Sequence, residues 1–169
     1  MKAFRNILIA VILMLAVGAL AFFALRKQDG PGTGDGGVAS GSVIINEFMA
    51  SNGGCLAGEN GEYHDWIEIY NPTGAAVSLA GMGLSDENSG APRWTFPNVQ
   101  IKAGEYLVVF ASGTGTASAG APAQHAAFKL SAAGGGIYLS SAAAGIVDKV
   151  EYKAQVQNVS MGRAPGLGE

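Results

Sequence analysis

The octapeptide Asp65–Pro72, DWIEIYNP, decides the fold class of this chain of 169 residues. Ile67 and Ile69 alternate with more polar neighbours, as in a β-strand with one buried face, and NPTG at 71–74 then gives a strong turn signal. Similar short runs recur every 8–14 residues, and none carries the i, i+3, i+4, i+7 apolar stripe of an amphipathic helix. Seven to nine short strands at this spacing predict an all-β sandwich or barrel.

The alternation also predicts which side chains face the core. The expected strands are residues 43–50, 65–70, 77–85, 93–96, 99–101, 105–110, 127–130, 136–140 and 146–153. The side chains predicted to point inward are Ile67, Ile69, Tyr106, Val108, Phe110, Ile137, Leu139, Val150 and Tyr152. Ser112–His125 is expected to be a loop. Gly134–Gly136 is expected to be a hairpin turn, because it lacks the strand and helix that flank a phosphate loop.

The N-terminal region contains one long apolar run. Ile7–Leu25, ILIAVILMLAVGALAFFAL, has 19 residues without a polar side chain and is followed by Arg26-Lys27. A helix of that length spans about 28 Å, close to the ~30 Å hydrocarbon thickness of a bilayer. Residues 1–28 are therefore predicted to be a signal anchor, one transmembrane helix that leaves the rest of a single-pass protein outside the cytoplasm. Ala19-Leu20-Ala21 also fits a signal-peptidase site, so secretion after cleavage is the alternative.

The stretch after this run has the composition of a linker. Asp29–Ser42, DGPGTGDGGVASGS, is rich in Gly and cannot bury apolar area, which predicts a flexible tether. One β-domain is then expected over residues 43–165, with 166–169 as the C-terminal end.

Charge and cysteine content exclude several classes of protein. From Gly30 onward the chain has six Lys and Arg against twelve Asp and Glu, whereas nucleic acids and anionic lipids bind clustered basic residues. A nucleic-acid partner is therefore not expected. Cys55 is the single cysteine, which excludes a disulfide within the chain and a Cys-based zinc site. Because it lies in a Gly-rich segment, we expect an exposed, unpaired thiol.

Eight blocks in a fixed order carry a family resemblance. They are VIINEFMA (43–50), DWIEIYNP (65–72), VSLAGMGLSD (77–86), RWTFP (93–97), IKAGEYLVVFAS (101–112), HAAFKLSAAGGGIYLSS (125–141), GIVDKVEY (145–152) and SMGR (160–163). Together they resemble the lamin tail domain (LTD) family, which implies an immunoglobulin-like β-sandwich without catalysis of its own. The apolar N-terminus, with no coiled-coil rod, is similar to the bacterial exported or membrane-anchored type.

These features favour a non-catalytic, membrane-anchored extracytoplasmic module for interaction or scaffolding. The membrane, through Ile7–Leu25, and a protein or cell-surface ligand are the partners expected, and no enzyme activity, cofactor or metal is predicted. Family members usually continue beyond the GR-x-P block, whereas residues 166–169 end this sequence. The alternative is thus an accessory domain that positions a nuclease, phosphatase or spore-coat-type kinase domain absent from this chain.

Acidic residues provide the first candidates for chemistry. Glu47 and Glu68 lie in predicted strands and could form an acid–base pair, but solvent-facing or hydrogen-bonded structural roles are favoured. Asp86, Asn88 and Gly90 in SDENSG have the spacing of a calcium loop without its later ligands, so a β-turn is predicted. A weak divalent-cation patch could gather Glu59, Glu62, Asp65 and Glu87.

The remaining candidates favour structural roles. His64 and His125 are the only histidines, and no G-x-S-x-G accompanies them, so a hydrolytic triad is not expected. Asn158-Val159-Ser160 is a glycosylation sequon that matters only in a eukaryotic secretory pathway. Trp66 and Trp94 could form an aromatic binding platform, but core packing of at least one is favoured.

Overall fold

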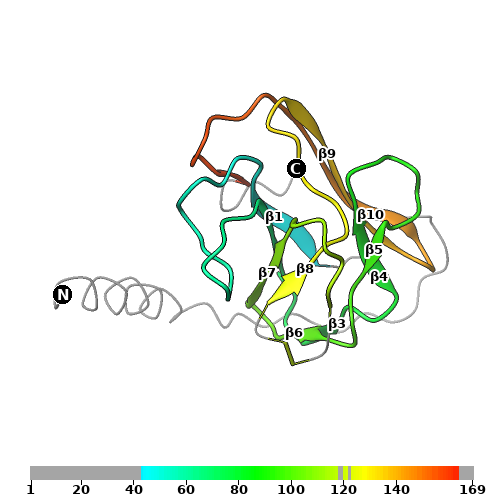
Figure 1. Ribbon diagram of the computed structural model, residues 1–169. Helices are drawn as coiled ribbons and strands as arrows, with labels where there is room; N and C mark the ends of the chain where they lie inside the picture. The colour runs from blue at the N-terminus through cyan, green and yellow to red at the C-terminus, as the bar shows by residue number, and fades with distance from the viewer. Residues whose placement is uncertain (1–42, 118–119, 122, 164–169) are drawn as a thin grey trace, which may run out of the picture. The chain divides into compact units, whose positions relative to one another are not determined.

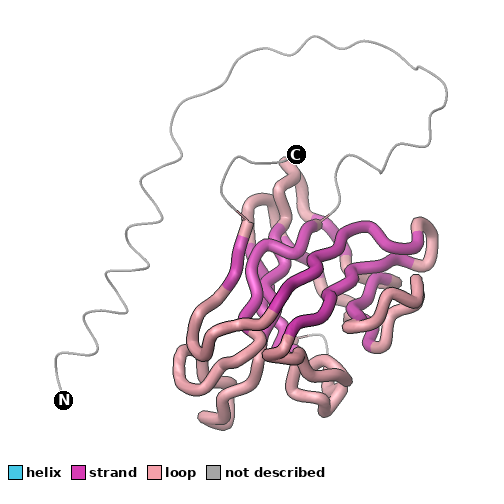
Figure 2. The backbone as a smooth tube through the Cα atoms, turned by 90° about the horizontal axis from the view of Figure 1, so that it is seen from above, coloured by secondary structure: helices cyan, strands magenta, loops and turns pink. Residues whose placement is uncertain are grey.

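The computed structural model describes residues 43–117, 120–121 and 123–163. Their regular structure is entirely β, as Figure 2 shows, and none of these residues forms a helix able to cross a membrane. The strands are β1 Ile44–Met49, β2 Trp66–Tyr70, β3 Val77–Ser78, β4 Met82–Ser85, β5 Trp94–Thr95, β6 Gln100–Ile101, β7 Tyr106–Phe110, β8 Gln124–His125, β9 Gly134–Ser141, β10 Gly145–Lys153 and β11 Met161–Gly162. The predicted anchor, linker and C-terminal end lie outside the described residues.

Two main sheets form the layers of the domain (Figure 1). One has the order β11-β1-β2-β7-β8, antiparallel except for the parallel pair β7 and β8, and the other has the order β10-β9-β4-β5. A small third sheet pairs β3 with β6. β1, β2 and β7 lie side by side in one sheet, whereas β4 and β5, which come between β2 and β7 in the chain, belong to the opposite sheet. Strands that are neighbours in a sheet are therefore often far apart in the chain.

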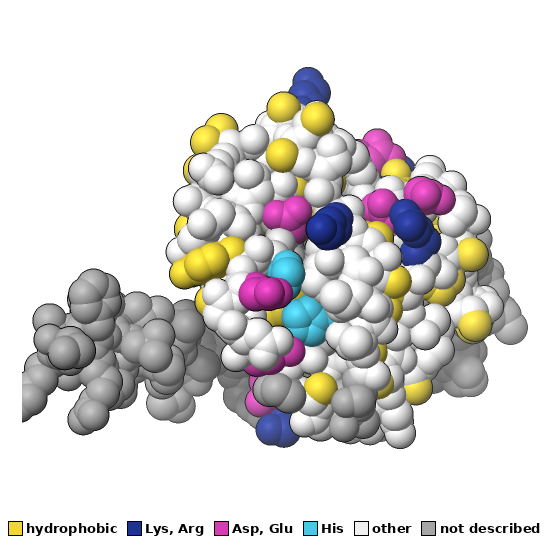
Figure 3. Space-filling view, in the orientation of Figure 1, with side chains coloured by type: hydrophobic (Ala, Val, Ile, Leu, Met, Phe, Trp, Pro, Cys, Tyr) yellow, Lys and Arg dark blue, Asp and Glu magenta, His cyan; other side chains and the backbone are white. Residues whose placement is uncertain are grey.

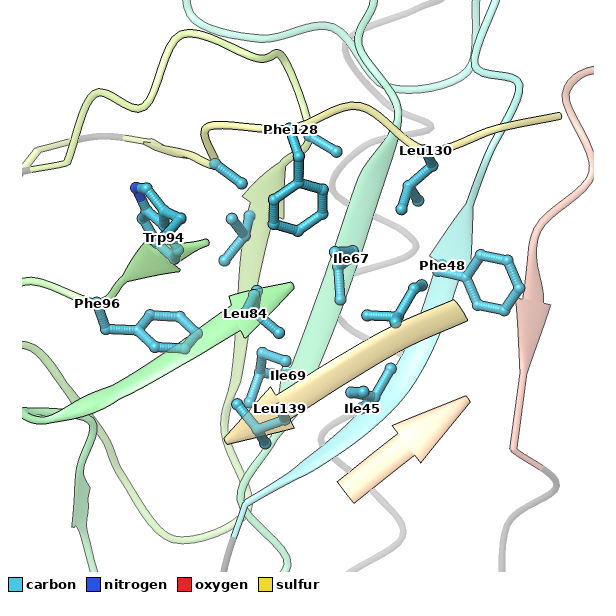
Figure 4. Close-up of a cluster of buried hydrophobic side chains, with 14 of the residues drawn as sticks. Ile45, Phe48, Ile67, Ile69, Leu84, Trp94, Phe96, Phe128, Leu130 and Leu139 are labelled. Carbon is cyan, nitrogen blue, oxygen red and sulfur yellow. The ribbon is translucent and has the colours of Figure 1, made fainter. Parts of the chain in front are cut away.

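Side chains from both sheets share one core (Figure 4). Ile45, Ile67 and Ile69 of the first sheet face Leu84 and Leu139 of the second, and all five are fully buried. Phe128 and Leu130 enter the same cluster from the segment between β8 and β9. The expected all-β sandwich is confirmed, as are the inward positions of Ile137, Val150 and Tyr152.

The prediction for β7 was wrong about its face. Tyr106, Val108 and Phe110 point away from the main core, and Leu107 and Val109 point into it. Register explains the difference, because Ile67 pairs with Val109 and Ile69 pairs with Leu107, and directly paired residues lie on the same face. Phe110 is nevertheless buried, in a second cluster with Met49 and Trp66 on the outer face.

Several predicted boundaries also change. The run 77–85 is divided into β3 and β4 by Gly81, whose φ of +79° turns the chain. Residues 127–130 form no strand, whereas β8 falls within the predicted 112–125 loop. Gly134–Gly136 is not a turn but the start of β9, opposite Glu151–Lys153, and the chain turns at Ser131–Ala133 instead. Very short strands such as β8 and β11 raise the number in the described residues to eleven.

A carboxylate joins the two main sheets where each has an irregularity. The register of β1 shifts between Ile45 and Glu47, and that of β10 shifts between Ile146 and Asp148. Asp148 Oδ2 accepts a hydrogen bond from the Ile45 amide at 2.7 Å, and Asp148 Oδ1 pairs with Arg163 Nη2 at 2.6 Å. Arg163 also donates its backbone N–H to Asn46, which holds the end of β11 against β1.

Candidate functional site

A row of histidines and carboxylates lies on one face of the domain, where Figure 3 shows the two imidazoles side by side. The rings of His64 and His125 are 5.9 Å apart in an edge-to-face arrangement. His125 Nε2 lies 3.0 Å from Glu59 Oε1, and His64 Nε2 lies 3.1 Å from Glu62 Oε2. Each imidazole therefore has its own carboxylate, both from the loop that connects β1 to β2.

Asn52 organises this loop. Its buried Nδ2 donates to the carbonyls of Leu56 and His64, and its Oδ1 accepts from the amides of Cys55 and Leu56. Asp65 Oδ1 in turn accepts the Asn52 backbone N–H at 3.0 Å. Burial raises the pKa of the Asp65 carboxyl, although this hydrogen bond opposes the shift. Hydrogen bonds between residues of this loop thus fix its conformation, and this conformation positions Glu59 and Glu62 beside the histidines.

His125 connects a hydroxyl to a carboxylate. Its Nδ1 lies 3.0 Å from Ser112 Oγ, so a neutral ring that donates Nε2–H to Glu59 accepts the Ser112 proton at Nδ1. Hydrogen bonds from the Glu59 backbone and from His125 lower the pKa of the Glu59 carboxyl. A Ser–His–acid row therefore exists that the sequence analysis did not expect.

The row lacks the arrangement of a hydrolytic triad. In such triads the nucleophile contacts Nε2 and the carboxylate contacts Nδ1, whereas here the two nitrogens are exchanged. Ser112 is also buried, and its Oγ is 2.9 Å from Thr114 Oγ1. A shallow pocket of about 390 Å³ is lined by Glu59, Thr116 and His125 among others, but Ser112 does not line it. The arrangement serves to hold β8 against the β1–β2 loop.

Glu47 and Glu68 form a carboxylate pair on the outer face of the five-stranded sheet. They are direct cross-strand partners, and Glu68 Oε1 accepts a hydrogen bond from Asn46 Nδ2 at 2.7 Å. Burial raises the pKa of the Glu68 carboxyl, and the charge of Glu47 raises it further against that hydrogen bond. On the same face, the rings of Tyr70 and Tyr106 stack at 4.5 Å. Both residues are half-buried, and the hydrogen bond from Asn46 gives Glu68 the structural role that the sequence analysis favoured.

The proposed cation ligands are occupied by other partners or lie apart. Arg93 Nη1 contacts both carboxylate oxygens of Asp86, at 2.8 and 3.1 Å, and also reaches Glu87. In the β4–β5 loop, these carboxylates are therefore engaged by Arg93. Across the described residues, no group of three or more His, Cys, Asp or Glu side chains is arranged to hold a metal.

Exposed apolar side chains gather at one end of the domain, which we call the distal pole. It consists of Cys55, Leu56, Val156, Val159 and Met161. Cys55 is exposed as expected, and its Sγ lies 3.6 Å from the Asn158 carbonyl. The distal pole lies beyond the Met49 end of β1, since Met161 pairs with Phe48 there.

Neither tryptophan contributes an exposed platform. Trp94 packs in the main core against Phe96, and Trp66 packs in the outer cluster, so core packing is confirmed for both. Sequence reasoning missed the His125–Glu59 contact, the Asp148 bridge and the distal pole. Only the last has a local signal, because Val156 and Val159 stand in a polar segment without the alternation of a strand.

Comparison with known proteins gives one result that bears on these sites. The family model described as Lamin Tail Domain, LTD, matches residues 38–154, which is more than half of the chain. No curated protein matches the chain. The matched residues include β1 through β10, with both histidines and Asp148, whereas β11 and Arg163 lie beyond them.

Proposed function

The chain belongs to the lamin tail domain family, and we propose that it is a non-catalytic interaction module held at the outer face of a membrane. One observation carries the proposal: the candidate chemical groups are paired with other side chains of the domain, whereas apolar side chains are exposed together at the distal pole. Val156 is 68% exposed and Val159 is 51% exposed. A binding surface uses exposed apolar side chains of this kind, whereas catalysis needs accessible polar ones.

The anchor is proposed to be Ile7–Leu25, which the linker 29–42 joins to the domain. The linker joins the domain at Val43, next to the first residue of β1, and the distal pole lies beyond the last residue of that strand. Six residues of strand separate the two ends by about 17 Å. A domain tethered through Val43 would therefore carry its apolar surface at the end opposite the attachment point.

Membrane fractionation of the full chain tests this role. The protein is expected in the membrane fraction, resistant to alkaline carbonate, with Met1–Lys27 retained in the mass of the intact protein. Protease added to spheroplasts should remove the domain. A matched variant, Leu13→Arg/Leu15→Arg, interrupts the apolar run and should abolish carbonate resistance, because each charge at the centre of a membrane helix costs about 2.5–3.5 kcal/mol. A mature N-terminus at Phe22 would show that the segment is a cleaved signal peptide.

A further inference from the structure

The outer face of the five-stranded sheet carries an accessible patch, which we call the tyrosine–glutamate face. It consists of side chains at paired positions of β1, β2 and β7, namely Ile44, Glu47, Glu68, Tyr70, Tyr106 and Val108. None of these residues is buried, and Tyr106 is 54% exposed. Further along the same face, Met49, Trp66 and Phe110 are buried in the outer cluster. A partner can therefore reach the glutamate and tyrosine end of the face directly.

Two like charges face each other in this patch. Glu47 and Glu68 are direct cross-strand partners, and like charges at such positions destabilise a pair of strands. Glu68 accepts a hydrogen bond from Asn46, whereas the Glu47 side chain has neither a hydrogen bond nor an ion pair within the part of the chain that the structure describes. Glu47 thus differs from the other candidate groups, because its charge is left without a partner.

The basic side chains of the described domain lie elsewhere. Four of them pair with other carboxylates, in the ion pairs Arg93–Asp86, Lys102–Glu105, Lys149–Glu151 and Arg163–Asp148. The charge of Lys129 acts on Asp65, and Lys153 lies at the end of β10 in the other main sheet. A cation that neutralises Glu47 and Glu68 must therefore come from outside the described domain.

The neighbouring tyrosines indicate the kind of cation. Tyr70 and Tyr106 are direct cross-strand partners whose rings stack at 4.5 Å. Burial and the charges of Tyr70 and Glu68 raise the pKa of the Tyr106 hydroxyl, so this ring lies within electrostatic reach of the Glu68 carboxylate. A guanidinium group binds carboxylates through parallel hydrogen bonds and also packs flat on aromatic rings, whereas an ammonium group is compact and strongly hydrated. Carboxylates beside an exposed aromatic ring therefore suit arginine better than lysine.

We propose that the tyrosine–glutamate face binds an arginine side chain of a partner protein. The guanidinium group donates hydrogen bonds to Glu47 and Glu68 and packs against the exposed ring of Tyr106. Its charge removes the repulsion between the two carboxylates, so binding relieves a cost that the free domain carries. Ile44 and Val108 flank the carboxylates on the neighbouring strands and offer apolar contacts to the residues beside the arginine.

This inference goes beyond the proposed function, because the tyrosine–glutamate face includes no residue of the distal pole. It adds a second surface to the module and assigns that surface a partner of defined chemistry.

An NMR titration of the isotope-labelled full chain, in non-ionic detergent at about 150 mM salt, tests the inference. The probe is a short glycine–serine peptide that contains two arginines. We expect saturable shifts of the amide signals of Glu47, Glu68 and Tyr106. The same peptide with lysine keeps the charge, and the same peptide with citrulline keeps the shape without the charge. Both are expected to bind more weakly than the arginine peptide.

Matched variants separate the face from the general acidity of the domain. Glu47→Gln/Glu68→Gln should raise the dissociation constant of the arginine peptide about tenfold, because it removes the charge-assisted hydrogen bonds. Glu87→Gln/Glu151→Gln removes the same charge from two exposed residues outside this face and should leave the constant unchanged.

The aromatic contribution has its own pair of variants. Tyr106→Leu should weaken binding of the arginine peptide, because it removes the ring on which the guanidinium group packs. Tyr63→Leu is the control, because Tyr63 is similarly exposed, at 49%, but lies in the β1–β2 loop.

Three results would overturn the inference: no saturable shifts with the arginine peptide, lysine or citrulline peptides that bind equally well, or equal losses for the two glutamine variants. Circular dichroism establishes that each variant is folded, and Glu47→Gln/Glu68→Gln is expected to melt no lower than the wild type because it removes a like-charge pair. The titration does not depend on where the protein resides in cells. Its failure is therefore distinguishable from failure of the fractionation test, which concerns location alone.

Discussion

Asp148 of β10 accepts a hydrogen bond from the Ile45 amide of β1 at 2.7 Å. A side chain of one main sheet thus provides the acceptor for a backbone amide of the other. Ile45 is completely buried, and its N–H lies where the register of β1 shifts. A carboxylate at this point satisfies a donor that would otherwise be buried without a partner, and it also holds Arg163.

Replacing Asp148, whose side chain is only 13% exposed, should therefore destabilise the domain. Asp148→Ala is expected to lower the free energy of unfolding by about 1–3 kcal/mol, the cost of an unsatisfied buried donor, in urea denaturation of residues 43–169. Asp86→Ala is the matched control, because it removes an exposed Asp–Arg pair, whose loss typically costs less than about 1 kcal/mol. Equal losses would mean that the Ile45 hydrogen bond contributes nothing.

Ile69 tests the assignment of the inner face. Ile69→Ala removes a fully buried side chain and is expected to cost about 2–5 kcal/mol in the same measurement. Val156→Ala, at a side chain that is 68% exposed, should change stability by less than about 0.5 kcal/mol. A small loss for Ile69 would show that β2 presents its other face to the core.

Gly83 lies inside β4 at a point of close approach between strands. A Cβ atom there would overlap the Trp94 carbonyl oxygen and lie 2.5 Å from Pro92 Cβ, and neither group can move easily. Gly83→Ala is therefore expected to destabilise the domain by about 1–3 kcal/mol, as overpacked sites do. Gly54→Ala meets nothing within 4 Å and serves as the control in thermal denaturation. A neutral Gly83→Ala would contradict the observed β4–β5 spacing.

The raised pKa of the Glu68 carboxyl predicts that the stability of the domain depends on pH. Burial and Glu47 raise the pKa of this carboxyl in the folded state, so the folded domain binds more protons than the unfolded chain between the two pKa values. Stability should fall as pH rises through that window, which begins near the ordinary pKa of about 4.3. Glu68→Gln keeps an oxygen for the Asn46 amide, removes the charge, and should flatten this decline while stabilising the domain at pH 7.

Urea titrations from pH 4 to pH 7 measure this effect. Glu105→Gln is a suitable control, because Glu105 is exposed and contacts only the exposed Lys102 among the charged side chains in the described structure. Parallel pH profiles for the wild type and Glu68→Gln would refute the proposed origin of the decline.

The distribution of positive charge predicts no binding to duplex DNA. Arg93, Lys102, Lys149 and Arg163 each pair with a carboxylate of the domain. Phosphate binding gains affinity when several basic groups release counterions together. Fluorescence anisotropy at about 150 mM salt should therefore detect no binding by residues 43–169. Micromolar binding that weakens steeply with added salt would instead favour a nucleic-acid role.

Local sequence determined the class of the fold and much of its core. Regular turn signals separate the strands, and the alternation around Ile67 and Ile69 assigns the inner face of β2 because only one of its faces carries aliphatic side chains throughout. The NPTG turn is equally local, since Asn71 uses its own side chain to bind the Thr73 amide and the Ala75 carbonyl. Such features depend on residues close together in the chain, which a sequence displays directly.

Tertiary structure decided what depends on partners distant in the chain. Every position of β7, YLVVF, can be buried, so alternation does not choose a face, and pairing with β2 assigns Leu107 and Val109 to the core. His125 contacts Glu59, which lies 66 residues earlier in the chain, and Asp148 contacts Ile45, which lies 103 residues earlier. These contacts, like the meeting of residues 51–58 with 154–162 at the distal pole, arise only when the sheets stack, because no local pattern encodes which loops share an end of a sandwich.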